Sequence, residues 1–218
     1  MKLAAPLLLA ATLVLAAPAA MATEPVEGRD YFKLSPPLPP ADASRIVVIE
    51  FFSYQCPHCY RFAKPFAAWT ASLPADVRAD RAAVAIGHAA WAASAQAFYA
   101  LSVLKAVPGI DDAFFGAIHQ ERKPLTDEAS ITNWVAGQGI DRTQFQNAYR
   151  SFSVQLQMKR ADDLTRAVRL PSVPALLIDG KYLLPVSDDG KFTGQLDFAK
   201  TLIARARSER AAVRKSAP

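Results

Sequence analysis

The chain has 218 residues and a mass of 23.6 kDa, with 51% apolar and 21% charged residues. These proportions suit a globular domain with a sizeable core and exclude a disordered or fibrous chain. The formal charge of +5 and the pI near 9.3 do not indicate a nucleic-acid partner, because the basic residues are scattered along the chain. The 2 cysteines are too few for a disulfide scaffold.

The first 22 residues have the pattern of a secretory signal peptide. Lys2 provides the positive start, an uncharged apolar stretch covers residues 3–17, and Ala20 and Ala22 are small residues of the kind that a signal peptidase recognises. The apolar stretch is shorter than the roughly 20 residues that a membrane-spanning helix needs. No later stretch is long and apolar enough to cross a membrane. We therefore expect the mature protein to be exported and soluble.

A short strand is predicted at Ile46–Phe52, which is apolar, β-branched and aromatic. A helix is predicted soon afterwards, because Phe62, Phe66 and Trp69 recur at spacings of four and three. Pro57 suits the first turn of that helix, where its missing N–H costs nothing. The connection between the two elements therefore ends at the helix N-terminus.

Further helices are indicated by capping patterns in the middle of the chain. The candidate starts are Asp111, the segment Thr126–Glu128, and Asp141 with Gln144 three residues later. A strand is predicted at Arg81–Ile86, and a last helix runs from Leu196 to about Val213. The aromatic residues of these helices are expected in the core, and the basic residues of the last helix at a solvated helix end.

Both cysteines lie in the tetrapeptide Cys56-Pro57-His58-Cys59. A structural disulfide over so short a loop would stabilise little. A zinc site would need two further ligands, and His88 and His119 are badly spaced for this. Haem attachment is excluded, because Tyr60 stands where the histidine would be. The pattern favours a redox-active dithiol, with an exported metal-binding module as the alternative outside enzymes.

The position of Cys56 at a helix N-terminus favours its thiolate, because free N–H groups and the helix dipole stabilise a negative charge there. His58, between the two sulfurs, would add to this as a donor or an imidazolium. A buried Cys59 would stay a thiol until it attacks a mixed disulfide. A low pKa at Cys56 stabilises the reduced state, so the sign of the effect favours disulfide donation over reduction.

The segment Ser172–Ala175 precedes a predicted hairpin, in which Asp179 and Gly180 separate two apolar runs. Pro174 is expected at the start of the first strand, where proline is tolerated. Whether the Val173–Pro174 peptide bond is cis is left open by the sequence.

These motifs together resemble the DsbA family of thiol:disulfide interchange proteins of Gram-negative bacteria. The resemblance rests on Cys-Pro-His-Cys after Glu50-Phe51-Phe52-Ser53-Tyr54, on Ser172-Val173-Pro174-Ala175 before a Gly-Lys-Tyr hairpin, and on Arg150-Ser151-Phe152-Ser153-Val154. It implies an α/β thioredoxin fold, a mixed sheet flanked by helices, with an inserted helical subdomain. The implied division is a signal peptide (1–22), a first thioredoxin part (23–87), the helical insertion (88–161) and a second thioredoxin part (162–218).

The resemblance also implies roles for residues. Cys56 would be the exposed nucleophile, Cys59 the resolving thiol and His58 the residue that destabilises the disulfide. Val173 and Pro174 would form a cis-proline loop that offers its backbone to substrate. Glu50 matches a buried acid that helps to move protons from Cys59, although a strand-end carboxylate facing water is an equal alternative. Some relatives have an acid at the position of Ala63, so any electrostatic role there is absent.

The implied activity is that of a periplasmic dithiol oxidase that donates its disulfide to reduced, unfolded exported proteins. No cofactor or metal is implied, the family suggests a monomer, and the recycling partner would be a quinone-linked membrane protein of the DsbB type. A disulfide isomerase, or a reductase in cytochrome maturation, is the alternative within redox chemistry. An isomerase usually has an added N-terminal dimerisation domain, for which residues 23–44 leave no room.

Overall fold

A computed structural model of the chain describes residues 24–187 and 192–216. The predicted signal peptide, residues 1–22, lies outside the described residues. Five strands form one mixed sheet in the order β1-β5-β4-β2-β3, in which only the β2–β3 pair is parallel. The strands are β1 (Phe32–Lys33), β2 (Ile46–Phe52), β3 (Val77–Ala83), β4 (Ala175–Ile178) and β5 (Tyr182–Pro185).

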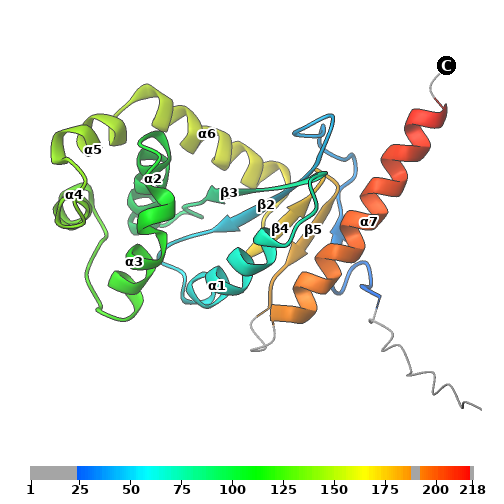
Figure 1. The fold of residues 1–218 in the computed structure, drawn as a ribbon, viewed down its shortest axis with the longest axis horizontal. Coiled ribbons are helices and arrows are strands. Elements are labelled where there is room, and N and C mark those ends of the chain that lie inside the picture. The colour runs from blue at the N-terminus through cyan, green and yellow to red at the C-terminus, as the bar shows by residue number, and fades with distance from the viewer. Residues whose placement is uncertain (1–23, 188–191, 217–218) are drawn as a thin grey trace, which may run out of the picture.

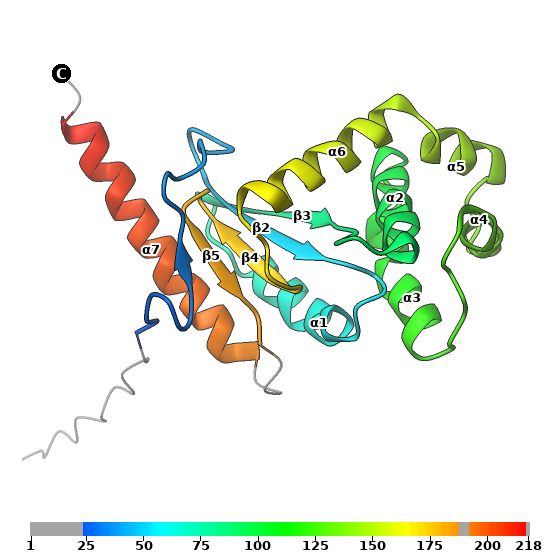
Figure 2. The ribbon, with the colours of Figure 1, turned by 180° about the vertical axis from the view of Figure 1, so that it is seen from behind.

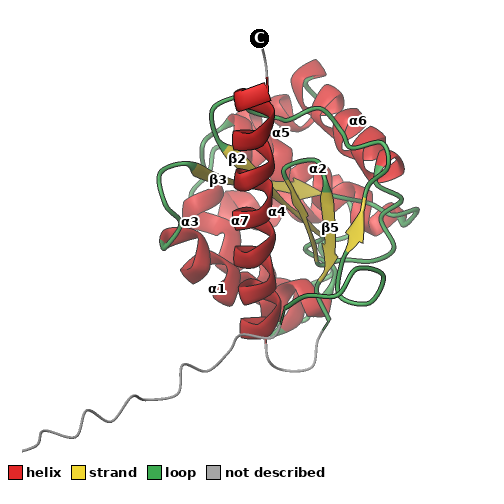
Figure 3. Cartoon of the chain, turned by 90° about the vertical axis from the view of Figure 1, so that its right-hand side faces the viewer, coloured by secondary structure: helices red, strands yellow, loops and turns green. Residues whose placement is uncertain are grey.

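Helices cover both faces of this sheet (Figure 1). They are α1 (Pro57–Ala71), α2 (Ala89–Val103), α3 (Val107–His119), α4 (Glu128–Gly137), α5 (Arg142–Tyr149), α6 (Phe152–Ala167) and α7 (Phe192–Ser216). Helices α1 and α7 lie on one face, and α6 runs along the other (Figures 2 and 3). Helices α2 to α5 form a group beyond the ends of β2 and β3, where β2 leads into α1 (Figure 1).

The core is divided by the sheet, because successive side chains of a strand point to opposite faces. Val48 of β2 packs with Phe62 of α1 and Leu202 of α7. Phe51 belongs to a second cluster, which continues into the helical group and includes Phe98 and Phe115. Strand β2 is buried along almost its whole length, which explains its continuous apolar sequence.

Strand β2 and the hairpin agree with the sequence, whereas strand β3 and the last helix differ from their predicted bounds. Strand β2 has the predicted bounds, and Asp179 and Gly180 form the turn between β4 and β5, both with positive φ. Strand β3 begins earlier than predicted and ends at Ala83, because the backbone turns into positive φ at Ile86 and Gly87. Helix α7 extends beyond both predicted ends.

The helical group also confirms two capping predictions and corrects a third. Asp127 and Asp141 are the N-caps of α4 and α5, and each accepts a hydrogen bond from the backbone three residues later. Asp111 lies inside α3 instead of at its start, because Pro108 provides an earlier helix start. The predicted end of the insertion at residue 161 falls within α6, which is continuous from residue 152 to 167.

Candidate active site around Cys56 and Cys59

The two cysteines lie where a buried strand passes into a helix, as the sequence predicts. Strand β2 ends at Phe52, and Cys56 is the N-cap residue of α1. Its side chain accepts a hydrogen bond from the backbone N–H of Cys59, with 3.4 Å between N and Sγ. Pro57 occupies the first turn, where no N–H is needed. Both cysteines are free thiols in this structure.

Cys56 is less accessible than the sequence suggested. We expected an exposed nucleophile, but the residue is only 4% exposed. The reason is a tertiary contact: the Sγ atom lies 3.5 Å from the carbonyl oxygen of Val173, which is 117 residues away in the sequence. A thiol donates to that carbonyl, whereas a thiolate would be left with the N–H groups of the helix start.

The pKa of Cys56 is lowered to about 6. The largest cause is the hydrogen bond from the Cys59 thiol, and the backbone N–H groups of Cys59 and His58 add to it against the opposing effect of burial. The charge of the His58 side chain is the smallest of these causes. The low pKa thus comes mainly from donors built into the first helical turn.

Cys59 has the opposite character. It is fully buried, and its pKa is raised, first by burial and then by the neighbouring Cys56 sulfur and the nearby Glu50 carboxylate. A thiol in this environment remains protonated near neutral pH. The two sulfurs are therefore chemically unequal although they are three residues apart.

His58 lies on the exposed side of the dithiol. Its Nδ1 atom is 3.1 Å from a guanidinium nitrogen of Arg61, and since a guanidinium only donates, Nδ1 is the acceptor in this contact. The contribution of His58 to the Cys56 thiolate is thus made more by its backbone N–H than by its ring.

The Val173–Pro174 segment lies against Cys56, as the resemblance implied. The peptide bond between Val173 and Pro174 is cis. Val186 donates its N–H to the Pro174 carbonyl at 3.0 Å, which ties the segment to the end of β5. The carbonyl of Val173 faces the reactive sulfur, and the rest of the residue is largely buried.

Glu50 is fully buried, which excludes the alternative of a strand-end carboxylate facing water. Its Oε2 atom lies 2.6 Å from Nε of Arg81, while Oε1 has no hydrogen-bond partner among the described residues. Burial raises the pKa of Glu50, and the Arg81 charge opposes that rise. The carboxyl thus takes up a proton more readily than a carboxyl in water does.

The sequence interpretation missed Arg81 and Asp111 as members of this site. Arg81 stands directly opposite Glu50 on the parallel strand β3 and also holds both oxygens of Asp111 at 2.8 Å. The Arg81 guanidinium lies 3.8 Å from the centre of the Phe52 ring. The Tyr54 hydroxyl donates to Asp111 at 2.6 Å. Only the pairing register of β2 and β3, which the sequence does not state, could have identified Arg81.

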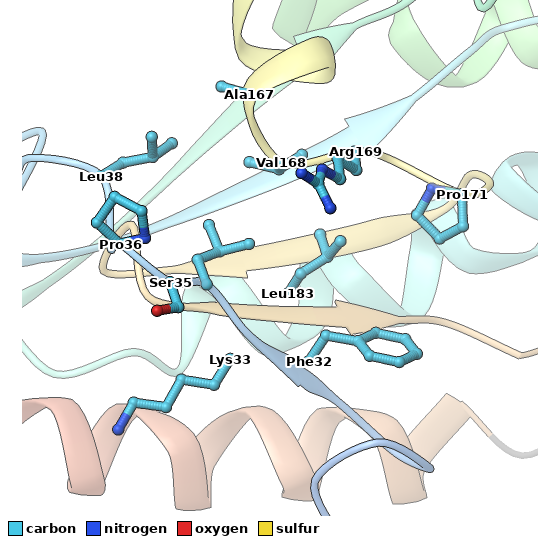
Figure 4. A pocket seen from close by; sticks show the side chains of 11 residues that line it. Phe32, Lys33, Ser35, Pro36, Leu38, Ala167, Val168, Arg169, Pro171 and Leu183 are labelled. Atoms are coloured by element: carbon cyan, nitrogen blue, oxygen red, sulfur yellow. The ribbon is translucent and has the colours of Figure 1, made fainter.

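The structure also has a cavity that lies away from the two cysteines. A cavity of about 620 Å³ lies at the opposite edge of the sheet, between β1 and the segment after α6 (Figure 4). Phe32, Arg169 and Pro171 are among its lining residues, and none of the predicted site residues is. Within residues 24–187 and 192–216, no three His, Cys, Asp or Glu side chains are grouped so as to hold a metal ion.

Comparison with known proteins agrees with this geometry. A family model described as a DSBA-like thioredoxin domain matches residues 47–197. The chain belongs to the DsbA-like thioredoxin family. It is 34% identical to the thiol:disulfide interchange protein DsbA of Pseudomonas aeruginosa over 197 residues, covering 90% of this chain and 92% of the relative. It is 35% identical to the DsbA of Bordetella parapertussis over 202 residues, covering 92% and 96%.

Solved DsbA structures have the same fold. The crystal structure of Pseudomonas aeruginosa DsbA matches with a TM-score of 0.79 and 33% identity, covering 84% of this chain and 94% of that one. The oxidoreductase DsbA from Xylella fastidiosa matches with a TM-score of 0.78 and 28% identity, covering 85% and 100%. The predicted thioredoxin fold and family are confirmed, and the chain is a thiol:disulfide oxidoreductase. Within the described residues, no helix has the length and hydropathy to span a bilayer.

Proposed function

We propose that this DsbA family member is a periplasmic dithiol oxidase that donates its Cys56–Cys59 disulfide to reduced exported proteins. The observation that carries the proposal is the inequality of the two sulfurs: the pKa of Cys56 is lowered to about 6, and that of Cys59 is raised. A stabilised thiolate makes the reduced enzyme the favoured product, so the disulfide is readily given away.

In the first step, a substrate thiolate attacks Sγ of Cys56 in the oxidised enzyme. The Cys56–Cys59 bond breaks, its electron pair goes to the Cys59 sulfur, and that sulfur takes up a proton. Glu50 is the proposed proton donor, since burial raises its pKa and its carboxyl is close enough to influence the Cys59 thiol. In the reverse direction, the Cys59 thiol returns its proton to Glu50, and its sulfur attacks the mixed disulfide at Cys56.

In the second step, another substrate thiolate attacks the substrate sulfur of the mixed disulfide. Cys56 leaves as a thiolate, which the N–H groups of Cys59 and His58 stabilise. The substrate loses two electrons and two protons; the enzyme gains both electrons and keeps one proton on Cys59, while the other proton goes to solvent because Cys56 stays a thiolate. Pro57 starts the helix that provides those N–H groups.

We assign substrate binding to the Val173–Pro174 segment. In the reduced enzyme, the Val173 carbonyl receives the Cys56 thiol. When Cys56 is bonded to another sulfur it has no proton to donate, so this carbonyl is available to a backbone N–H of an extended substrate. A segment fixed to β5 through Pro174 can hold such a chain across the reactive sulfur.

The cellular setting is part of the proposal. Residues 1–22 are a cleaved signal peptide by their sequence pattern, and the proposed recycling partner is a quinone-linked DsbB-type membrane protein that acts on the monomer. The thioredoxin parts (23–87 and 162–218) would carry the dithiol, and the insertion (88–161) would cover it, with α6 shared between them. The mass of protein recovered from periplasm tests the cleavage.

The redox equilibrium of the purified protein with glutathione tests the direction of the reaction. We expect the protein to be mostly reduced in buffers that leave ordinary structural disulfides intact, and to oxidise a reduced dithiol peptide stoichiometrically. We also expect the reduced form to melt at a higher temperature than the oxidised form. A more stable oxidised form, or a strongly reducing potential, would make this protein a reductase instead.

A further inference from the structure

The turn between β2 and Cys56 is stabilised by hydrogen bonds to the helical group as well as by a hydrogen bond within the turn. Cys56 donates its N–H to the Ser53 carbonyl at 3.1 Å, which closes a turn with Tyr54 and Gln55 at its centre. The Gln55 side chain donates to the carbonyl of Leu125, just before α4, at 2.8 Å. Both central residues thus have partners in the segment that follows β3.

His119, at the end of α3, is the partner of the Tyr54 backbone. Its Nε2 atom lies 2.8 Å from the Tyr54 carbonyl oxygen. Because a carbonyl only accepts, Nε2 must carry the proton and donate it. Tyr54 is fully buried, so its carbonyl has little access to water as an alternative donor.

The ring of His119 also contacts the other side of the dithiol. It stacks on the ring of Tyr60, with 5.0 Å between centroids and 12° between planes. Tyr60 directly follows Cys59, and its N–H donates to the Cys56 carbonyl at 3.0 Å. One side chain therefore contacts the chain two residues before Cys56 and one residue after Cys59.

The donor role does not depend on a charged ring. Burial lowers the pKa of His119, and the nearby Arg61 charge also lowers it, whereas the bond to Tyr54 raises it. A neutral imidazole with the proton on Nε2 satisfies every contact described above. His119 thus fits a fixed donor better than a general acid or base, and it does not touch either sulfur.

We propose that His119 is a positioning residue for the redox reaction, which holds the turn before Cys56 in register with the first turn of α1. This rests on the proposed function and adds a residue to it. The N–H groups that lower the pKa of Cys56 belong to α1, while the Cys56 backbone is placed by the turn. If the turn moves, the sulfur loses its alignment with those donors and with the Val173 carbonyl.

Two substitutions separate the donor from the ring. In His119→Gln the amide nitrogen occupies a place close to that of Nε2 and can still donate to the Tyr54 carbonyl, whereas the shorter amide in His119→Asn cannot reach it. We expect His119→Gln to keep the Cys56 pKa and the rate of peptide oxidation within about twofold of wild type. We expect His119→Asn to lower that rate about tenfold, the effect of leaving one buried acceptor unpaired.

The Cys56 pKa, followed by thiolate absorbance against pH, is the second measurement, and in His119→Asn it should move toward the ordinary thiol value of 9.0. The matched control is His88→Asn, which changes a histidine of the same helical group at the N-cap of α2 and should leave the rate and the Cys56 pKa unchanged.

The proposal is overturned if His119→Gln and His119→Asn have the same rate and the same Cys56 pKa, even where both melt at a lower temperature. That result would make His119 a packing residue only. The proposed function fails separately, through the wild-type glutathione equilibrium. The comparison of Cys56 pKa values among the variants remains decisive for His119 in that case.

Discussion

The ionisation of Cys56 should make the stability of the reduced protein depend on pH. The pKa of this thiol is about 6 in the folded protein, against an ordinary value of 9.0. The unfolded reduced chain therefore binds one proton more than the folded chain between these two values. Stability then rises with pH across this window by about 1.4 kcal/mol per pH unit.

The size of the effect follows from the difference of three units between the two pKa values. The contribution is absent well below pH 6, reaches about 1.4 kcal/mol at pH 7 and about 2.7 kcal/mol at pH 8, and approaches about 4 kcal/mol at pH 9. Because the folded pKa is the depressed one, stability is lost as pH falls through it. Cys59, with its raised pKa, opposes the gain only at higher pH, where the unfolded chain ionises it.

Urea unfolding of the reduced protein at several pH values measures this, with reduced Cys56→Ser as the control. Serine is close in shape and does not ionise, so other titrating groups cancel in the difference between the two proteins. We expect the difference in unfolding free energy to grow between pH 6 and pH 8. A difference that stays flat over this range would refute an ionised Cys56 in the folded state.

Three further substitutions, two of them paired with a control substitution, test other parts of the site and fold. Glu50→Gln should slow the attack of Cys59 on a mixed disulfide by at least about tenfold in rapid-mixing experiments, and an unchanged rate would remove Glu50 from the proton path. Arg81→Met should lower the unfolding free energy by about 3 kcal/mol, because it leaves the buried Glu50 carboxyl without its partner. The control is Arg207→Met, which breaks an exposed ion pair and should barely move the urea midpoint. Gly180→Ala should lower the unfolding free energy by about 1–3 kcal/mol, because φ is +66° and a Cβ would lie 2.8 Å from the Leu38 carbonyl oxygen. The control is Gly109→Ala, which has open space around it and should not lower the unfolding free energy.

Much of the redox chemistry could be predicted from residues that are close in sequence. The strand before Cys56, the proline in the first helical turn and the spacing of the two cysteines are local features, and helix capping acts over three or four residues. The helix N-terminus at Cys56 therefore follows from the sequence, and with it the direction of the pKa shift. The hairpin at Asp179 and Gly180 is local for the same reason.

The contacts that complete the site are not local. Arg81 meets Glu50 through the register of two parallel strands, and Asp111 reaches Arg81 only because α3 packs beside them. Pairing register and helix packing depend on the whole core. The residues next to Glu50 in the sequence therefore could not predict whether its carboxylate is buried or exposed.

The direction of the Cys56 pKa shift could be predicted from local sequence, because the Cys59 thiol and the backbone N–H groups that lower it lie in the same helical turn. How far the thiol is covered, and what holds it in place, depends on the packing of the complete chain. The Val173 carbonyl and the His119 ring come from segments remote in sequence, and only the packing of the complete chain brings them to the same few ångströms around Cys56.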